Sequence, residues 1–174
     1  MPSRRCGIKR CSAMAVDHRG VADFGAQLLA LQEDMPNIMS DLVVGEARHA
    51  AGEAKKICKT DSPDIVNTGD YRRNWKNDTT ATRRGYSYSA RCYNVLDYAS
   101  HLEYGFRSHF VPGHWEGNVF VYSRDDPEGG MYVGPRNGYV RGHFTLKRAK
   151  KRTLDSQGPR LSRKWDAAVQ RHIK

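Results

Sequence analysis

The stretch Asn94-Val-Leu-Asp-Tyr-Ala-Ser-His-Leu-Glu-Tyr-Gly105 carries the sharpest local pattern of the chain. Its apolar residues recur at steps of three and four, the spacing of one helical face: Val95, Tyr98, Ala99, Leu102 and the adjoining Phe106. Asn94 is a good N-cap, and Asp97 can return a bond to its backbone as in a capping box. Gly105 can adopt the left-handed conformation that ends many helices. We therefore predict a central helix of about three turns.

Two apolar stripes before this helix predict two further helical segments. The first stripe has a clean three-four spacing and consists of Val21, Phe24, Leu28, Leu31 and Met35. Pro36 follows directly, so we expect the helix to stop there or a new one to begin. The second stripe contains small residues that would let its helix lie close against a sheet or another helix: Val43, Ala47, Ala50, Ala54 and Ile57.

Between residues 75 and 93 the periodicity changes to two, which predicts strands. Apolar and polar residues alternate from Tyr86 to Tyr93, and Arg83-Arg84-Gly85 makes a hairpin turn with the run from Trp75 to Thr82. Beyond the central helix, we expect residues 107–117 to form a loop. Two short strands at 118–122 and 131–133 are expected to be joined by an acidic, Gly-rich turn into a hairpin arm.

Two helices are expected to close the chain. Residues 143–154 are strongly basic, Gly158-Pro159 interrupts the pattern, and a last stripe follows at Leu161, Trp165, Val169 and Ile173. The order of elements predicts an α+β fold: an antiparallel sheet of about four strands with a hairpin arm, packed by N-terminal, central and C-terminal helices. We expect one domain over residues 21–174 after a basic, disordered leader at 1–20, with either Met1 or Met14 as the start.

Charge is concentrated at the two ends of the chain. The net charge is +10, of which +4 lies in residues 1–20 and +9 in residues 141–174, so the middle is slightly acidic. Basic ends favour contact with nucleic acid or an acidic protein surface, although any single cation can equally belong to a solvated helix face. The candidate contacts to DNA or an acidic partner are Lys147, Arg148, Lys150, Lys151 and Arg152. No apolar run reaches membrane-spanning length, so we expect no membrane partner.

Catalytic and metal-binding patterns find little support in the sequence. Asn67-Thr-Gly69 stands where an aspartic protease would need a carboxylate, so we reject that chemistry. His101 and Glu103 are two apart on a predicted helix and point to different sides, whereas His109 and His114 fall in a predicted loop. We expect no catalytic residues, no metal and no cofactor, and we interpret Cys58 and Cys92 as small core residues in a reducing compartment.

Three motifs, in order, resemble the tail-completion family, the head–tail neck proteins of siphophages and related prophages. They are Pro63-Asp-Ile-Val-Asn-Thr-Gly-Asp-Tyr-Arg-Arg73, then Tyr98-Ala-Ser-His-Leu-Glu-Tyr-Gly-Phe106, then the basic helix starting His143-Phe-Thr-Leu-Lys-Arg-Ala149. The resemblance covers roughly residues 21–173. Asn67 replaces the family's usual Asp, Tyr71 its usual Leu, and the usual Pro before Phe144 is missing.

This resemblance implies a structural virion protein, not an enzyme. It would assemble in the host cytoplasm into a homo-oligomeric ring, a hexamer or dodecamer, that joins head and tail and lets genome DNA pass. Neighbouring head–tail connector or tail-tube proteins would be its partners. The candidate inter-subunit contacts are Glu103, Tyr104, Phe110, Trp115, Phe120 and Tyr122. The alternative is a small basic nucleic-acid-binding protein, either a regulator or an RNA-interacting domain, and a metal-dependent hydrolase using His101 or His114 is a more remote one.

Overall fold

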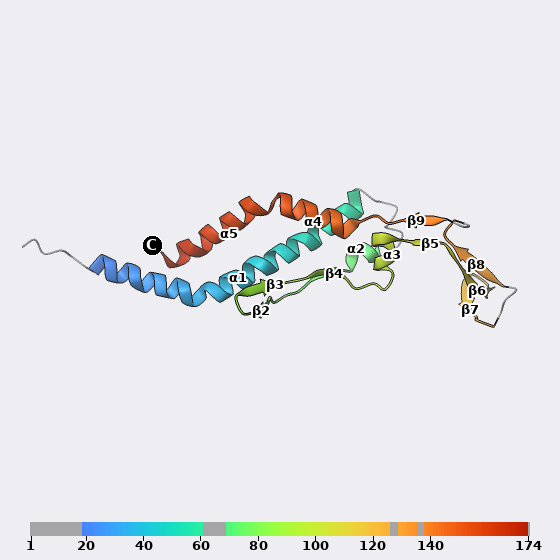
Figure 1. Cartoon of the computed structure of the whole chain (residues 1–174), viewed down its shortest axis with the longest axis horizontal. Helices are drawn as coiled ribbons and strands as arrows, with labels where there is room; N and C mark the ends of the chain where they lie inside the picture. The colour runs from blue at the N-terminus through green and yellow to red at the C-terminus, as the bar shows by residue number, and fades with distance from the viewer. Residues whose placement is uncertain (1–18, 61–68, 126–128, 136–137, 174) are drawn as a thin grey trace, which may run out of the picture.

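The protein is elongated, with helices over most of its length and a strand-built arm at one end (Figure 1). The computed structural model describes residues 19–60, 69–125, 129–135 and 138–173. Helices and antiparallel sheets of two and three strands alternate along the chain, which confirms the predicted α+β class and its N-terminal, central and C-terminal helices. The Asn67-Thr68 part of the Thr-Gly motif lies outside the described residues.

The N-terminal element is one long helix, α1 (Arg19–Thr60), and not two. Pro36 lies inside it, so the expected stop at this residue is wrong. A proline in a helix interior removes one hydrogen bond and crowds the preceding turn, which kinks the helix without having to end it. The axis of α1 changes direction part-way along (Figure 1). Ile38 and Val44, which follow the proline, are buried, so this part of α1 is packed against other elements of the chain.

Two C-terminal helices, α4 (Thr145–Asp155) and α5 (Gln157–His172), pack along α1. Of the small residues in the predicted stripe, Ala47 and Ala54 are buried and Ala50 is half-buried; Ala51, which the stripe did not include, is buried as well. The break between the two helices lies at Ser156, slightly before the predicted Gly158-Pro159. Proline is accepted in the first turn of a helix, where its missing N–H has no intrahelical partner to lose, so α5 starts ahead of it.

The main core lies where the second half of α1 meets α4 and the first strands. It consists of Ala54, Ile57, Cys58, Tyr71, Trp75 and Ala149. The short helix α2 (Asp70–Arg73) follows the left-handed Gly69 and places Tyr71 against Trp75, with ring centroids 5.5 Å apart in an edge-to-face contact. Tyr71 therefore contributes a large aromatic side chain to this core.

A long hairpin lies along α1 and contains four short strands (Figure 1): β1 (Trp75–Asn77), β2 (Thr82–Arg84), β3 (Ser87–Ser89) and β4 (Cys92–Asn94). β1 pairs with β4, β2 pairs with β3, and the turn contains Gly85 at φ 60°. From Ser87 to Asn94 burial alternates residue by residue, which confirms the predicted period of two. Tyr86, at the tip, is fully exposed.

The central helix, α3 (Ala99–Tyr104), is shorter than predicted because Asn94 does not cap it. Asn94 belongs to β4; its side-chain amide donates to the Tyr71 carbonyl at 2.8 Å, and its side-chain oxygen accepts from the Leu96 N–H at 3.1 Å. These bonds stabilise an extended strand end and a turn instead of a helix start. The predicted helix end at Gly105 is confirmed, but its conformation, φ 82° and ψ 179°, is an extended one that glycine adopts and not the left-handed one expected.

The arm consists of five strands beyond α3. β5 (Gly105–Arg107) pairs with β9 (Tyr139–Arg141), and β6 (His109–Glu116) lies between β7 (Val119–Tyr122) and β8 (Gly130–Val133). The prediction of a loop over residues 107–117 is therefore wrong, and so is the direct pairing of 118–122 with 131–133. Pro112 and Gly113 suggested a loop. In the structure Pro112 lies where β6 passes from pairing with β8 to pairing with β7, and its carbonyl accepts from the Ser123 N–H at 3.3 Å.

Candidate assembly surfaces

Glu103 joins the central helix to the basic helix α4. Its carboxylate accepts hydrogen bonds from the backbone N–H groups of Leu146, at 2.8 Å, and Lys147, at 3.1 Å. These N–H groups lie in the first turn of α4, where a helix has no internal acceptors and where a negative charge is favoured. Phe144, the residue at the N-cap position, supplies no side-chain cap. Glu103 thus caps a helix 43 residues away in the sequence.

This role overturns the expectation that Glu103 faces outward. Its exposed fraction is 6%, so within the chain it is an internal cap and not a surface contact. No local spacing in the sequence links Glu103 to residue 146, which is why the pattern of α3 alone could not reveal the bond. Tyr104, the next residue, is exposed as expected.

Gly105 and Gly142 let the arm approach the α3–α4 junction closely. A Cβ atom on Gly105 would lie 2.2 Å from the Val140 carbonyl oxygen, and one on Gly142 would lie 2.3 Å from the Glu103 carbonyl oxygen. Backbone bonds run across the same place, from the Phe144 N–H to the Glu103 carbonyl at 3.0 Å among others. The second and third motifs of the sequence therefore meet in one packed junction.

The first motif reaches the same region through the core. Ala149 of the third motif is fully buried in the cluster that contains Tyr71. Burial raises the pKa of the Tyr71 hydroxyl, which consequently stays protonated. The described part of the first motif, residues 69–73, and the other two motifs thus build a continuous body from which the arm and the helices extend.

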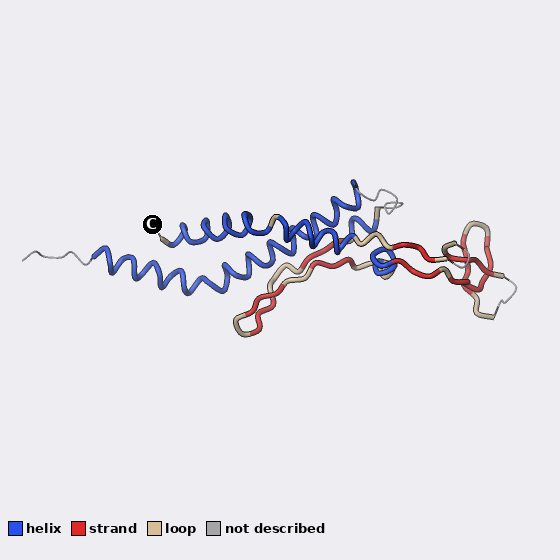
Figure 2. Tube along the Cα trace, turned by 45° about the horizontal axis from the view of Figure 1, so that its top comes forward, coloured by secondary structure: helices blue, strands red, loops and turns tan. Residues whose placement is uncertain are grey.

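Aromatic side chains lie along the outside of the arm. Tyr104, Phe110, Trp115 and Tyr122 are exposed, and Phe120 is half-buried, so five of the six predicted contact residues are at least partly available to a partner. Phe120 packs edge-to-face on Trp115 with centroids 5.3 Å apart. Figure 2 shows these strands at the end of the molecule opposite the start of α1. Exposed aromatic residues on a protruding sheet are typical of protein–protein interfaces.

The predicted basic residues lie on the outer side of α4. Lys147, Lys150, Lys151 and Arg152 are exposed, Arg148 is half-buried, and the inner side is formed by Thr145, Ala149 and Thr153. Lys147 also lies 5.8 Å from the centroid of the Phe144 ring, a cation–π contact. The helix therefore presents a dense positive face, as an anionic partner would require.

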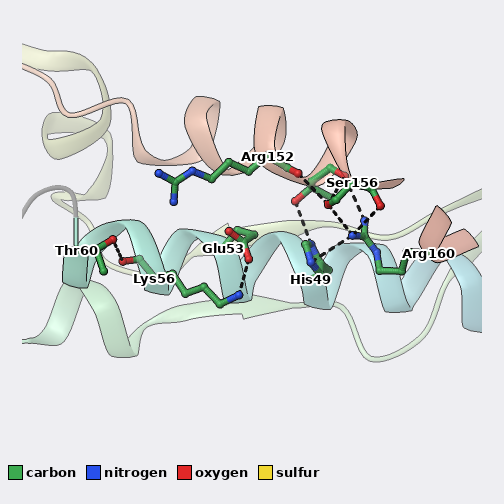
Figure 3. A network of polar contacts seen from close by, with 8 residues as sticks. His49, Glu53, Lys56, Thr60, Arg152, Ser156 and Arg160 are labelled. Carbon is green, nitrogen blue, oxygen red and sulfur yellow. Dashed lines mark hydrogen bonds and ion pairs between the residues drawn. The ribbon is translucent and has the colours of Figure 1, made fainter. Parts of the chain in front are cut away.

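A polar network holds α5 against α1. Arg160 donates to both carboxylate oxygens of Glu46, at 2.8 and 2.5 Å, and also to the Ser156 hydroxyl at 2.8 Å. Figure 3 shows Arg160 reaching toward His49 and Ser156 at the junction of α4 and α5. The bonds from Arg160 hold the pKa of the Glu46 carboxyl below its usual value. Sequence reasoning missed this pair, because its members are 114 residues apart and neither breaks a local pattern.

The histidines considered as metal ligands and the two cysteines considered as core residues contact neighbouring parts of the chain. His101 makes an edge-to-face contact with Phe106 at 5.6 Å, and His114 contacts Glu116 at 3.3 Å. Cys58 is buried and Cys92 half-buried; burial raises the pKa of both thiols, that of Cys92 to about 11, so both are protonated at neutral pH. In the part of the chain that the structure describes, no three His, Cys, Asp or Glu residues gather as metal ligands do.

Comparisons with protein-family models, curated proteins and solved structures give no match to this chain. The resemblance to tail-completion proteins therefore rests on the three sequence motifs alone and stays a prediction. No helix among the described residues is long and apolar enough to cross a membrane.

Proposed function

We propose that this chain is a structural virion protein of the phage head–tail neck or tail terminus. It assembles into a ring, a hexamer or dodecamer, that joins head and tail and passes genome DNA, and it has no catalytic role. Its partners are neighbouring connector or tail-tube proteins. The observation that carries the proposal is the meeting of the motifs at one junction, where Glu103 caps α4 and Gly105 packs against β9. Residues that build one junction are better evidence of a family than scattered matches.

The shape of the chain also supports assembly. The arm exposes aromatic residues at a distance from the main core, and the basic face of α4 lies on the body. A subunit with two different surfaces can contact its neighbours head to tail, and such contacts close into a ring when the rotation between subunits permits. The arm would supply one of these surfaces.

Light scattering on the purified full-length chain tests this proposal. We expect a mass several times that of the 19.7 kDa monomer. Changing Trp115 and Tyr122 together to Ser should reduce that mass, because both exposed side chains lie on the arm. Tyr86→Ser is the matched control, since Tyr86 is a fully exposed aromatic residue at a different hairpin tip and its loss should leave the mass unchanged. A strictly monomeric wild-type chain at every concentration would contradict the proposal.

The exposed basic face of α4 favours a second candidate function, binding nucleic acid as a monomer. A gel-shift series over salt concentration distinguishes the two. For a monomeric DNA binder, changing Lys147, Lys150 and Lys151 to Gln should weaken binding and reduce the log–log salt slope by about 0.9 for each lost phosphate contact. Lys76→Gln, on the exposed side of β1, serves as the control. Binding that is equally weak in all variants would remove this candidate.

A further inference from the structure

The first part of α1 carries an apolar stripe that no other element among the described residues covers. Val21, Phe24 and Leu28 have exposed fractions of 71%, 50% and 42%. Leu31, which is half-buried, continues the stripe at the same three-four spacing. This spacing is that of the a and d positions of a coiled coil, the seam along which one helix packs against another.

The same seam continues into a helix–helix interface within the chain. Three residues after Met35 the stripe reaches Ile38, whose exposed fraction is only 4% because α5 covers it. His172, at the end of α5, contacts Asp34 at 3.0 Å. The part of α1 that precedes this contact extends beyond the end of α5 and does not lie beside it (Figure 1). Within the part of the chain that the structure describes, one continuous seam is thus covered by α5 in its second part and lacks a covering helix in its first.

We propose that the first part of α1 pairs with the same segment of a second copy of this chain. The positions that flank the seam from Val21 to Leu31 are uncharged: Gly25, Gln27 and Gln32. Asp34, the next flanking position, is engaged by His172 of α5 within the chain. Charges at such flanking positions select unlike partners or repel like ones, so a neutral flank suits two identical helices. Asp23 and Glu33 occupy positions that point away from the seam in this pattern.

In the proposed pair, the first part of α1 in one copy runs antiparallel to the same segment in the other copy. A parallel pair would place both basic C-terminal regions, +9 in each chain over residues 141–174, at the same end, where they would repel. An antiparallel pair separates them and also opposes the helix dipoles favourably. The seam is symmetric for this arrangement, because centring the pair on Ala26 places Phe24 opposite Leu28 and Val21 opposite Leu31 of the other copy.

The contact is short, so the pairing is concentration-dependent. Residues 19–35 form about 25 Å of helix, and such a seam buries less than the roughly 1,200 Å² of a standard stable interface. The pairing goes beyond the proposed function and does not rest on it. A two-fold contact joins copies in pairs whether or not the arm closes a ring, and in combination the two contacts would join two rings face to face.

Sedimentation velocity of the full-length chain tests the pairing. Leu28→Asp should halve the particle mass at high protein concentration, whatever the wild-type mass. Ala26→Asp is the matched control, because Ala26 is exposed on the opposite face of the same turn, and it should keep the wild-type mass. Circular dichroism checks that both variants retain their helix content. An unchanged mass for Leu28→Asp, or an equal loss for Ala26→Asp, would overturn the proposal.

Crosslinking then tests the direction of pairing. In a background with Cys6 and Cys11 changed to Ser, a mixture of Phe24→Cys and Leu28→Cys chains should form mainly mixed disulfide dimers on mild oxidation. Dimers of Phe24→Cys alone and Leu28→Cys alone would contradict the antiparallel arrangement, and no crosslink above background would contradict the pairing. Absence of rings from the wild-type chain with this crosslink retained would count against the ring and not against the pair.

Discussion

Replacing Glu103 gives a direct measure of the junction on which the fold depends. Two N–H groups of α4 donate to its carboxylate, at 2.8 and 3.1 Å, in a site that is 6% exposed. Hydrogen bonds to a charged group contribute about 1.5–3 kcal/mol each, and loss of a helix cap costs about 0.5–2 kcal/mol. Water can reach part of the first turn of α4 after truncation, so we expect Glu103→Ala to lower the free energy of unfolding by about 3 kcal/mol. Glu103→Gln keeps one acceptor oxygen and should cost about 1 kcal/mol.

Urea unfolding followed by circular dichroism at 222 nm measures both values. For a domain of this size, a loss of 3 kcal/mol corresponds to a fall of about 6–12 °C in Tm. Asp97→Asn is the matched control, because Asp97 is an exposed carboxylate just before α3 and its change should stay within about 0.5 kcal/mol. If Glu103→Ala is no more destabilising than Asp97→Asn, the capping role is refuted.

Three further predictions concern the turn, the core and the acid stability. Gly105→Val should destabilise by about 2 kcal/mol or more in thermal melts, because of its positive φ and the close carbonyl, whereas Gly25→Ala in open helix should stabilise by about 0.5 kcal/mol. Tyr71→Phe should leave stability almost unchanged, since the buried hydroxyl has no hydrogen-bond partner among the described residues, but Tyr71→Ala should cost about 3–5 kcal/mol in urea titrations. The Arg160 bonds lower the pKa of Glu46 in the folded state, so their contribution is present above the ordinary value of 4.5 and is lost as the pH falls through the lowered pKa. Glu46→Gln should therefore flatten the acid end of the stability–pH curve, and an unchanged curve would show that the pair contributes nothing.

Features set by local periodicity were predictable from the sequence. The stripe from Ala47 to Ile57, the alternation around Tyr88 and the helix end at Gly105 all appear where expected. Each depends on repeats of 3.6 or two residues, or on a backbone angle that glycine adopts most easily. The candidate contact surface on the arm was predictable for a related reason, since large aromatic residues in polar surroundings seldom all fit into a small core.

Features set by distant partners were not predictable. Pro36 was expected to end a helix, but α1 continues through it, and Ile38 and Val44 beyond it are buried. Asn94 was expected to cap a helix, but the Tyr71 carbonyl, 23 residues away, engages its side chain. Glu103 was placed on the surface because the first turn of α4 was not known to lie beside it. In each case a tertiary contact overrides a local preference.

Negative-stain electron microscopy of the purified full-length chain shows whether it assembles into a ring. We expect closed rings with a central opening, built from several copies in contact through the arm, and loss of those rings when Trp115 and Tyr122 are changed to Ser. Fields that contain only single elongated particles or simple two-fold pairs, with no closed ring at any protein concentration, would contradict this expectation.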